Sequence, residues 1–167
     1  MNIKAGDLLV EDIVRSVMTP RVVTVDSQEP VRRALQLMDE NDIGAIVVTV
    51  AENPEGVVTE KDVVRRIARE TLELDRPVGE IMTRPLISIN SEAPVTQALY
   101  IMVERKVRRL PVLKDGRLVG IIVERDIMRW LIDRPDVILD LFSLTAPNVA
   151  KEAVAAILRE LQLREKI

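Results

Sequence analysis

The sequence predicts an α+β fold made of two β-α-β-β-α repeats that pack with pseudo-two-fold symmetry, followed by C-terminal helices. The main observation is an internal duplication: residues 18–65 align without a gap with residues 82–129, and 14 of the 48 pairs are identical where about 3 would be expected by chance. Hydrophobic periodicity and turn signals give the same order of elements in both copies. Each copy is too small to bury its sheet alone, so the two should pack together.

The first repeat opens at Met18 and Thr19. Its expected elements are a strand at 22–25, a helix that begins near Pro30, a strand at 43–50, a strand at 56–58 and a helix from 59 to about 71. The run 43–50 is almost continuously apolar, which predicts a strand buried on both faces. A turn containing Asn-Pro is expected at 51–55. The first helix has an apolar face formed by Val31, Ala34, Leu35 and Met38.

The second repeat opens at Met82 and Thr83 and has the same pattern. Its expected elements are a strand at 86–89, a helix that begins near Pro94, strands at 110–113 and 118–122 joined by a turn at 114–117, and a helix at 124–132. The chain is thus divided into an N-terminal segment (1–16), a first repeat (17–72), a second repeat (73–132) and a C-terminal helical extension (133–167). The extension is apolar enough to cover the repeats or a partner subunit.

The composition excludes several classes of function. The 167-residue chain contains no cysteine and no histidine, which excludes thiolate or imidazole metal sites and catalysis by Ser-His or Cys-His pairs. A net charge of -3 gives no overall attraction to nucleic acid. No apolar run is long enough to span a membrane, and residues 1–16 lack the apolar core of a signal peptide. A cytoplasmic protein without membrane or nucleic-acid partners is therefore expected.

Two aspartates occupy equivalent positions at the start of the last helix of each repeat, Asp62 and Asp126. An Asp in the first turn of a helix ordinarily accepts hydrogen bonds from free backbone N-H groups. The same carboxylate can instead face outward and hold a pair of hydroxyl groups, such as those of a ribose. The residue pattern alone leaves both interpretations open.

These motifs resemble the cystathionine-beta-synthase (CBS) domain family, specifically a tandem pair of such domains. The resemblance rests on the two Met-Thr openings, on Leu110-Pro111-Val112, and on the segment from Gly56 to Asp62 with its counterpart from Gly120 to Asp126. It covers about residues 10–132. It implies a regulatory module that binds adenine nucleotides or, in some members, S-adenosylmethionine, and that commonly forms a homodimer.

The resemblance also implies roles for single residues. In the family, the helix-start Asp holds the ribose and the hydroxyl residue three positions earlier contacts phosphate, which assigns these roles to Asp62 and Thr59. Basic residues before the buried strand of the partner repeat neutralise phosphate, which points to Arg108 and Arg109, and arginines suit this task chemically. Thr24 and Ser88, near the ends of the short strands, could line the adenine pocket, although strand hydroxyls are more often structural.

The second pocket should be weaker than the first. It retains Asp126, but Val123 stands where Thr59 stands in the first repeat, and Gly44 and Ala45 replace the arginines. We therefore expect it to bind weakly, to accept an uncharged adenosine group or to stay empty. The arginines have an ordinary alternative too, as exposed charges paired with Glu104 or Asp115.

Three classes of function remain open. The first, favoured here, is a sensor that requires no cofactor, binds AMP, ADP or ATP as a regulatory ligand, and acts allosterically on a separate, unidentified partner protein. The second is a non-catalytic assembly protein with degenerate pockets and functional C-terminal helices. The third is a carboxylate-based nucleotide hydrolase, but no acids occur at a metal-binding spacing, so an enzyme is not expected.

Overall fold

The computed structural model of the chain describes residues 12–69, 73–134 and 137. Residues 12–124 form one compact unit, and the described residues from 125 onward belong to a second unit. The helices predicted in the C-terminal extension lie outside the described residues, apart from residues 133, 134 and 137. The sequence boundaries at 16, 72 and 132 stay a prediction.

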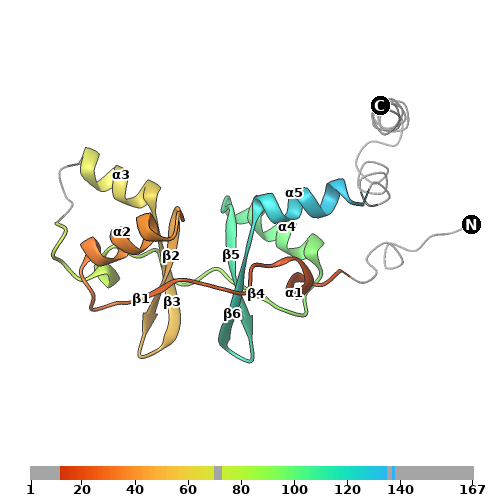
Figure 1. Cartoon of the computed structure of the whole chain (residues 1–167), viewed down its shortest axis with the longest axis horizontal. Helices are drawn as coiled ribbons and strands as arrows, with labels where there is room; N and C mark the ends of the chain where they lie inside the picture. Colours follow the sequence, from red (N-terminus) through yellow and green to blue (C-terminus); the bar gives the residue numbers. More distant parts are fainter. Residues whose placement is uncertain (1–11, 70–72, 135–136, 138–167) are drawn as a thin grey trace, which may run out of the picture. The chain divides into compact units, whose positions relative to one another are not determined.

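The structure confirms the α+β fold and the β-α-β-β-α order in both repeats (Figure 1). The first repeat contains β1 (Thr24–Asp26), α2 (Val31–Glu40), β2 (Ala45–Val50), β3 (Asn53–Thr59) and α3 (Glu60–Ala68). The second contains β4 (Ile89–Asn90), α4 (Val95–Arg105), β5 (Arg109–Lys114), β6 (Arg117–Val123) and α5 (Glu124–Ile132). Just before the Met-Thr opening of each repeat comes a short helical turn, α1 (Val14–Val17) or η1 (Val78–Glu80).

Each repeat forms a three-stranded sheet with the same topology. The central strand, β2 or β5, pairs in parallel with the short first strand and antiparallel with the third. The register is conserved between the repeats, because Val48 pairs with Gly56 in one sheet and Val112 with Gly120 in the other, each followed by a register shift. The duplication seen in the sequence is thus reproduced in the hydrogen-bond pattern.

Several bounds differ from the sequence-based expectation. In the second repeat, β4 is Ile89–Asn90 rather than 86–89, because only these two residues pair with β5. The first strand begins at Thr24 rather than Val22, since only Thr24–Asp26 pairs with β2. The turn between β2 and β3 takes just Ala51 and Glu52, which have φ values of 47° and 66°. Asn53 and Pro54 belong to β3 instead of the turn. Pro54 is tolerated there because it lies at the register shift opposite Thr49, where the ladder is already irregular.

The core of the first repeat lies between its sheet and its helices, and in the second repeat the sheet packs on α4. In β2 the four residues from Ala45 to Val48 are all buried, as expected for a strand covered on both faces. On α2, Val31, Ala34 and Met38 are buried and Leu35 is partly buried, which confirms the predicted apolar face. In the second repeat, Val95, Ala98 and Met102 of α4 are buried in the same way.

The two repeats exchange their opening segments. Thr19, which opens the first repeat, exchanges two main-chain hydrogen bonds of 2.9 Å with Ile121 of β6 in the second repeat. Thr83, which opens the second repeat, bonds in the same way to Val57 of β3, at 2.8 and 3.1 Å. From Thr19 the chain then crosses to β1 of the other sheet (Figure 1). Each sheet is therefore extended by a segment that leads into the other repeat.

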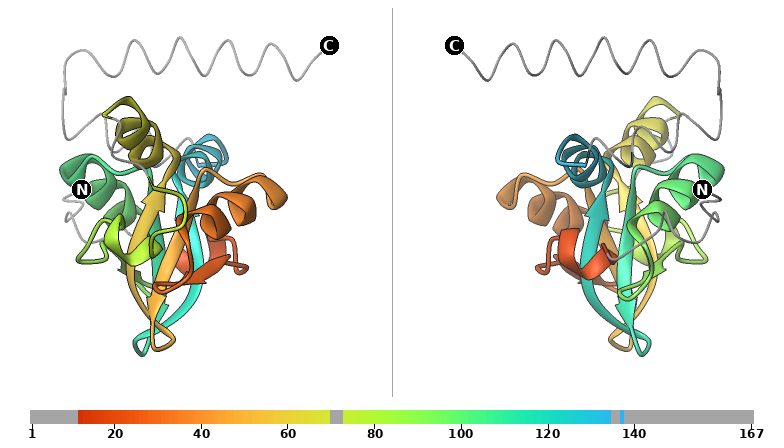
Figure 2. Two further views of the ribbon diagram at one scale, coloured as in Figure 1. Left: turned by 90° about the vertical axis from the view of Figure 1, so that its left-hand side faces the viewer. Right: turned by 90° about the vertical axis from the view of Figure 1, so that its right-hand side faces the viewer.

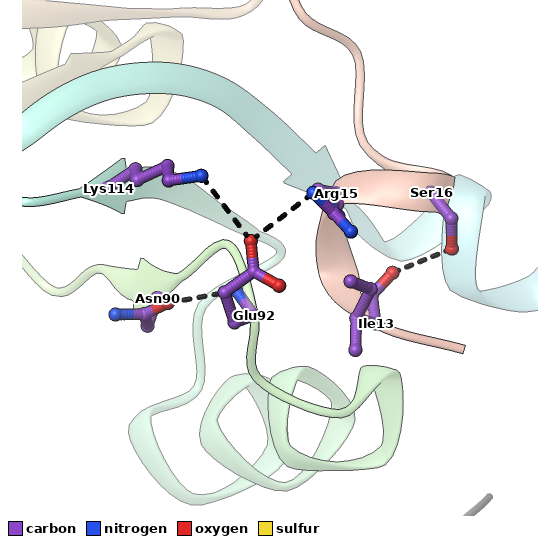
Figure 3. A network of polar contacts seen from close by, with 6 residues as sticks. All are labelled: Ile13, Arg15, Ser16, Asn90, Glu92 and Lys114. Atoms are coloured by element: carbon purple, nitrogen blue, oxygen red, sulfur yellow. Dashed lines mark hydrogen bonds and ion pairs between the residues drawn. The ribbon is translucent and has the colours of Figure 1, made fainter. Parts of the chain in front are cut away.

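A polar network ties α1 to the second repeat (Figure 3). Glu92 lies 3.6 Å from Arg15 of α1 and 3.8 Å from Lys114 of β5, and its backbone N-H donates to Asn90 Oδ1 at 2.8 Å. The backbone N-H of Arg15 also donates to the Ser91 carbonyl at 3.0 Å. Because the ion pairs are exposed, the main-chain bonds and the burial of Val14 are the stronger part of this attachment.

The exchange depends on a glycine in each third strand. A Cβ atom at Gly56 would lie 2.8 Å from the Thr83 carbonyl oxygen, and one at Gly120 would lie 2.9 Å from that of Thr19 and would also collide with Met18. We expect Gly56→Val to lower the free energy of unfolding by about 1 to 3 kcal/mol, because the crossing backbone cannot approach the strand. Urea denaturation measures this loss.

Gly116→Asn is the matched control. Gly116 has a φ of 77° with no atom near its would-be side chain, and Asn tolerates that conformation. Its stability should change little. Equal losses in the two variants would contradict the tight approach of the exchanged segments.

Candidate functional site

The start of α3 is a capping box made by Thr59 and Asp62. Thr59 ends β3 in an extended conformation, and its hydroxyl lies 3.4 Å from the backbone N-H of Asp62, whose carboxylate accepts in return from the Thr59 backbone N-H at 3.0 Å. The Thr59 hydroxyl and Asp62 Oδ2 are 2.7 Å apart. All these contacts use Oδ2, so no described residue hydrogen-bonds to Oδ1. The aspartate thus caps the helix through Oδ2 and leaves Oδ1 without a hydrogen bond from a described residue.

The two arginines come from the other repeat, where α4 gives way to β5. Lys106 ends α4 in a left-handed conformation with a φ of 54°, and the Val107 N-H returns to the Met102 carbonyl at 3.0 Å. This tight reversal places Arg108 and Arg109 directly before the buried part of β5. Arg108 is exposed, whereas Arg109 is partly buried. The predicted pairing of Arg108 with Glu104 or Asp115 is not seen, because its ion pair is with Glu124 at 3.8 Å.

One cavity of about 490 Å³ brings the four residues Thr59, Asp62, Arg108 and Arg109 together. Both repeats contribute to its walls, which consist of the start of α3, the segment that begins at Thr83 and the α4–β5 connection. Apolar side chains line it as well, namely Val57, Pro85, Leu86, Ile87, Val107 and Pro111. The cavity therefore combines an apolar wall with a hydroxyl, a carboxylate and cations.

Positive charge dominates the lining. The cations are Lys61, Arg65, Lys106, Arg108 and Arg109, and the only acids in this lining are Glu60 and Asp62. Sequence reasoning found the two arginines and missed the other three cations and Glu60. The helical spacing of Lys61 and Arg65 was an available signal, since residues four apart share one face of a helix. The position of Lys106 in the lining depends on the left-handed conformation of this residue at the end of α4, which the sequence does not indicate.

The pKa of Arg109 is lowered from its ordinary value, first because burial disfavours the charged guanidinium and further because Arg108 repels it. Glu60 opposes this shift by attraction. Arg109 nevertheless stays charged at neutral pH, since arginine does not lose its proton in proteins. A phosphate beside Arg109 would compensate the partly desolvated charge, which makes this position suited to an anionic ligand.

Glu60 occupies the space that a side chain at position 44 would need. A Cβ atom at Gly44 would lie 2.7 Å from Glu60 Oε2, and the Glu60 backbone N-H donates to the Gly44 carbonyl at 3.2 Å. The equivalent contact in the second repeat is made by Glu124, whose N-H donates to the Arg108 carbonyl at 2.9 Å. Each arginine thus has a helix-start glutamate as its nearby carboxylate.

The remaining predicted site residues are not placed in this cavity. Thr24 lines a different cavity, beside the turns of the two hairpins. Ser88 is partly buried just before β4 and is in the lining of neither cavity. Asp126 lies in the first turn of α5, which belongs to the second unit, so the pocket around it stays a prediction.

Metal binding and membrane insertion find no support in the part of the chain that the structure describes. No cluster of three or more acids in it could hold a metal ion. None of its helices combines the length and apolarity that crossing a bilayer requires.

The CBS domain family model matches residues 10–69 and, again, residues 78–133. The CBS domain-containing protein YhcV of Bacillus subtilis is 31% identical over 114 residues, a match that covers 68% of this chain and 81% of YhcV. An uncharacterised protein of Methanocaldococcus jannaschii is 31% identical over 134 residues, which are 72% of this chain and 32% of that protein. The chain thus spans about a third of the length of that relative.

A solved structure with similar architecture is the CBS domain protein PAE2072 from Pyrobaculum aerophilum, complexed with AMP. It aligns with a TM-score of 0.66 and 26% identity, over 73% of this chain and 99% of that one.

We expect Asp62→Ala to lower the free energy of unfolding by about 1 kcal/mol, because the capping box loses its carboxylate acceptor. Urea denaturation at neutral pH measures the loss, and Asp39→Ala, at an exposed position inside α2, is the control. A loss no larger than that of the control would contradict the capping role. A loss of this size leaves the domain folded, so the variant remains usable for binding experiments.

Proposed function

Because the chain belongs to the CBS domain family, we propose that it is a regulatory module that senses an adenine nucleotide and acts on a separate partner protein. The observation that carries the proposal is the single cavity lined by Thr59, Asp62, Arg108 and Arg109. CBS-domain proteins are generally regulatory or signal-transduction modules rather than catalysts. The AMP complex of PAE2072 supports an adenine nucleotide as the ligand.

Each part of the ligand has a counterpart in the cavity. Asp62 Oδ1, which no described residue contacts, would accept hydrogen bonds from the ribose hydroxyls. Leu86 and Ile87 offer the apolar wall on which adenine would pack. The phosphate would lie between the guanidinium groups and the first turn of α3, whose backbone N-H groups and dipole favour negative charge. A cavity of about 490 Å³ is in the range used for small-molecule ligands.

The charge of the lining supports AMP, ADP or ATP over S-adenosylmethionine. Five cations against two acids favour an anionic ligand. S-adenosylmethionine carries a positive sulfonium, which these side chains would repel. It remains the alternative ligand if the methionyl carboxylate alone reaches the arginines.

Signalling would follow from the two-sided construction of the site. The ligand would contact the start of α3 in one repeat and the α4–β5 connection in the other, so binding favours one arrangement of the repeats over alternatives. A partner that distinguishes these arrangements would be regulated, and the coupling would be reciprocal. We also propose that the chain forms a homodimer and that the regulated protein is a separate chain.

An assembly function is the second candidate, because α4 exposes two large side chains one turn apart. Tyr100 is 65% exposed and Val103 is 68% exposed, and at the equivalent positions of α2 stand the polar residues Gln36 and Asp39. Such a surface suits contact with another protein. This candidate and the sensor differ in their response to nucleotides.

Adenine nucleotide should stabilise the folded protein. A ligand at a hundred times its dissociation constant adds about 2.7 kcal/mol to the free energy of unfolding. We expect this from at least one of AMP, ADP and ATP, measured by thermal unfolding, and we expect Asp62→Ala and Arg109→Ala to lose most of it. Asp39→Ala and Arg105→Ala, at exposed positions outside the cavity, should retain it. Absence of stabilisation by all three nucleotides would favour the assembly function, and stabilisation by S-adenosylmethionine alone would identify the alternative ligand.

Glu60 should oppose phosphate binding, because its carboxylate competes for Arg109. We expect Glu60→Gln to raise the affinity for AMP by about threefold to tenfold while leaving the affinity for adenosine unchanged. Isothermal titration calorimetry measures both constants, with Glu55→Gln, an exposed acid on β3, as the control. Equal changes for AMP and adenosine would show that Glu60 does not act through the phosphate.

A further inference from the structure

The second cavity of the unit 12–124 has a volume of about 800 Å³ and shares no lining residue with the first. Three segments line it: residues 20–24 where the chain crosses between the sheets, the β2–β3 turn and the β5–β6 turn. Figures 1 and 2 show the two hairpins ending at the same side of the unit, with the crossing segment passing over them. The cavity is thus an open one, lined by residues of both repeats.

Two guanidinium groups, of Arg21 and Arg117, line this cavity without a carboxylate partner among the described residues. The acid in the lining is Glu52, which makes no ion pair with either arginine. Unpaired cations that share a hollow attract an anion, and guanidinium groups bind phosphate through paired hydrogen bonds.

Neutral polar groups complete the lining. Thr24 is exposed, and its hydroxyl bonds to no side chain in the part of the chain that the structure describes. Asn53 donates to the Ala51 carbonyl at 3.1 Å, which leaves its side-chain oxygen available. Both turns are held by left-handed backbone, at Ala51 and Glu52 in one hairpin and at Asp115 and Gly116 in the other. The cavity wall is therefore built on defined turns.

The duplication indicates that the cation of the crossing segment, Arg21, is specific to one side of the module. At the positions 64 residues later, Pro85 stands in place of Arg21 and Leu113 in place of Thr49. A surface merely inherited with the repeat would carry the same residues twice. The crossing segment therefore carries a cation in the first repeat alone, whereas Ser88 keeps a hydroxyl at the position equivalent to Thr24.

We propose that the cavity between the two hairpin turns and the crossing segment is a second anion site, which binds a small molecule carrying a phosphate group through Arg21 and Arg117. Its volume is in the range of small-molecule sites. The ligand would contact the turn of each repeat and would thus be sensitive to their relative arrangement. Thr24, selected from the sequence for the adenine pocket, would contact this second ligand instead.

The test is a titration of the full chain with inorganic pyrophosphate at constant ionic strength, followed by nuclear magnetic resonance of the backbone amides. Gly116 lines the second cavity and Gly44 lines the first, so their amide signals report separately on the two sites. We expect a saturable shift of the Gly116 signal. Arg21→Ala and Arg117→Ala should each raise its dissociation constant about tenfold, the effect of losing one charged hydrogen-bonding partner. Arg105→Ala should leave it unchanged.

Further arms separate this site from the nucleotide site. Arg109→Ala should abolish the shift of the Gly44 amide signal and preserve that of Gly116. Loss of binding at the nucleotide site can therefore be distinguished from loss of binding at the second cavity. A Gly116 signal that does not shift, or that shifts equally in Arg21→Ala, Arg117→Ala and Arg105→Ala, would overturn the proposal. Binding of malonate as tight as that of pyrophosphate would overturn the assignment to phosphate.

Discussion

The exchange of opening segments between the repeats is the constraint on which the rest of the structure depends. Thr19 and Thr83 each bond by two main-chain hydrogen bonds to the third strand of the opposite sheet. Backbone pairing of this kind is directional and leaves no buried donor unsatisfied, so it fixes where each crossing segment lies. It also requires the glycines at 56 and 120, whose missing side chains let the backbones approach.

Both cavities follow from this exchange. In the first, the segment after Thr83 contributes Leu86 and Ile87, which face residues from α3 and from the α4–β5 connection. In the second, the segment after Thr19 contributes Arg21 and Thr24 between the two hairpin turns. Neither cavity belongs to one repeat alone. A ligand in either would therefore report on how the repeats are arranged, which is what a sensor requires.

Divergence between the repeats has given the equivalent positions different chemistry. Thr59 can cap α3 with its hydroxyl, whereas Val123 cannot do so for α5. Arg108 brings charge to the first cavity, and its counterpart Gly44, which lines the same cavity, leaves room for the Glu60 side chain. The duplication thus supplied two similar frameworks, and substitutions at a few positions gave one of them a hydroxyl and two guanidinium groups.

The sequence by itself determined the elements of both repeats, because hydrophobic period, turn residues and helix caps act over a few neighbouring residues. The duplication supported each of these assignments twice, and the resemblance to the CBS domain family pointed from residues 59–62 and 108–109 to one cavity. Only the tertiary structure decided that Lys106 joins it, and that Thr24 belongs to another. Those outcomes depend on the crossing of segments far apart in sequence, which local patterns do not encode.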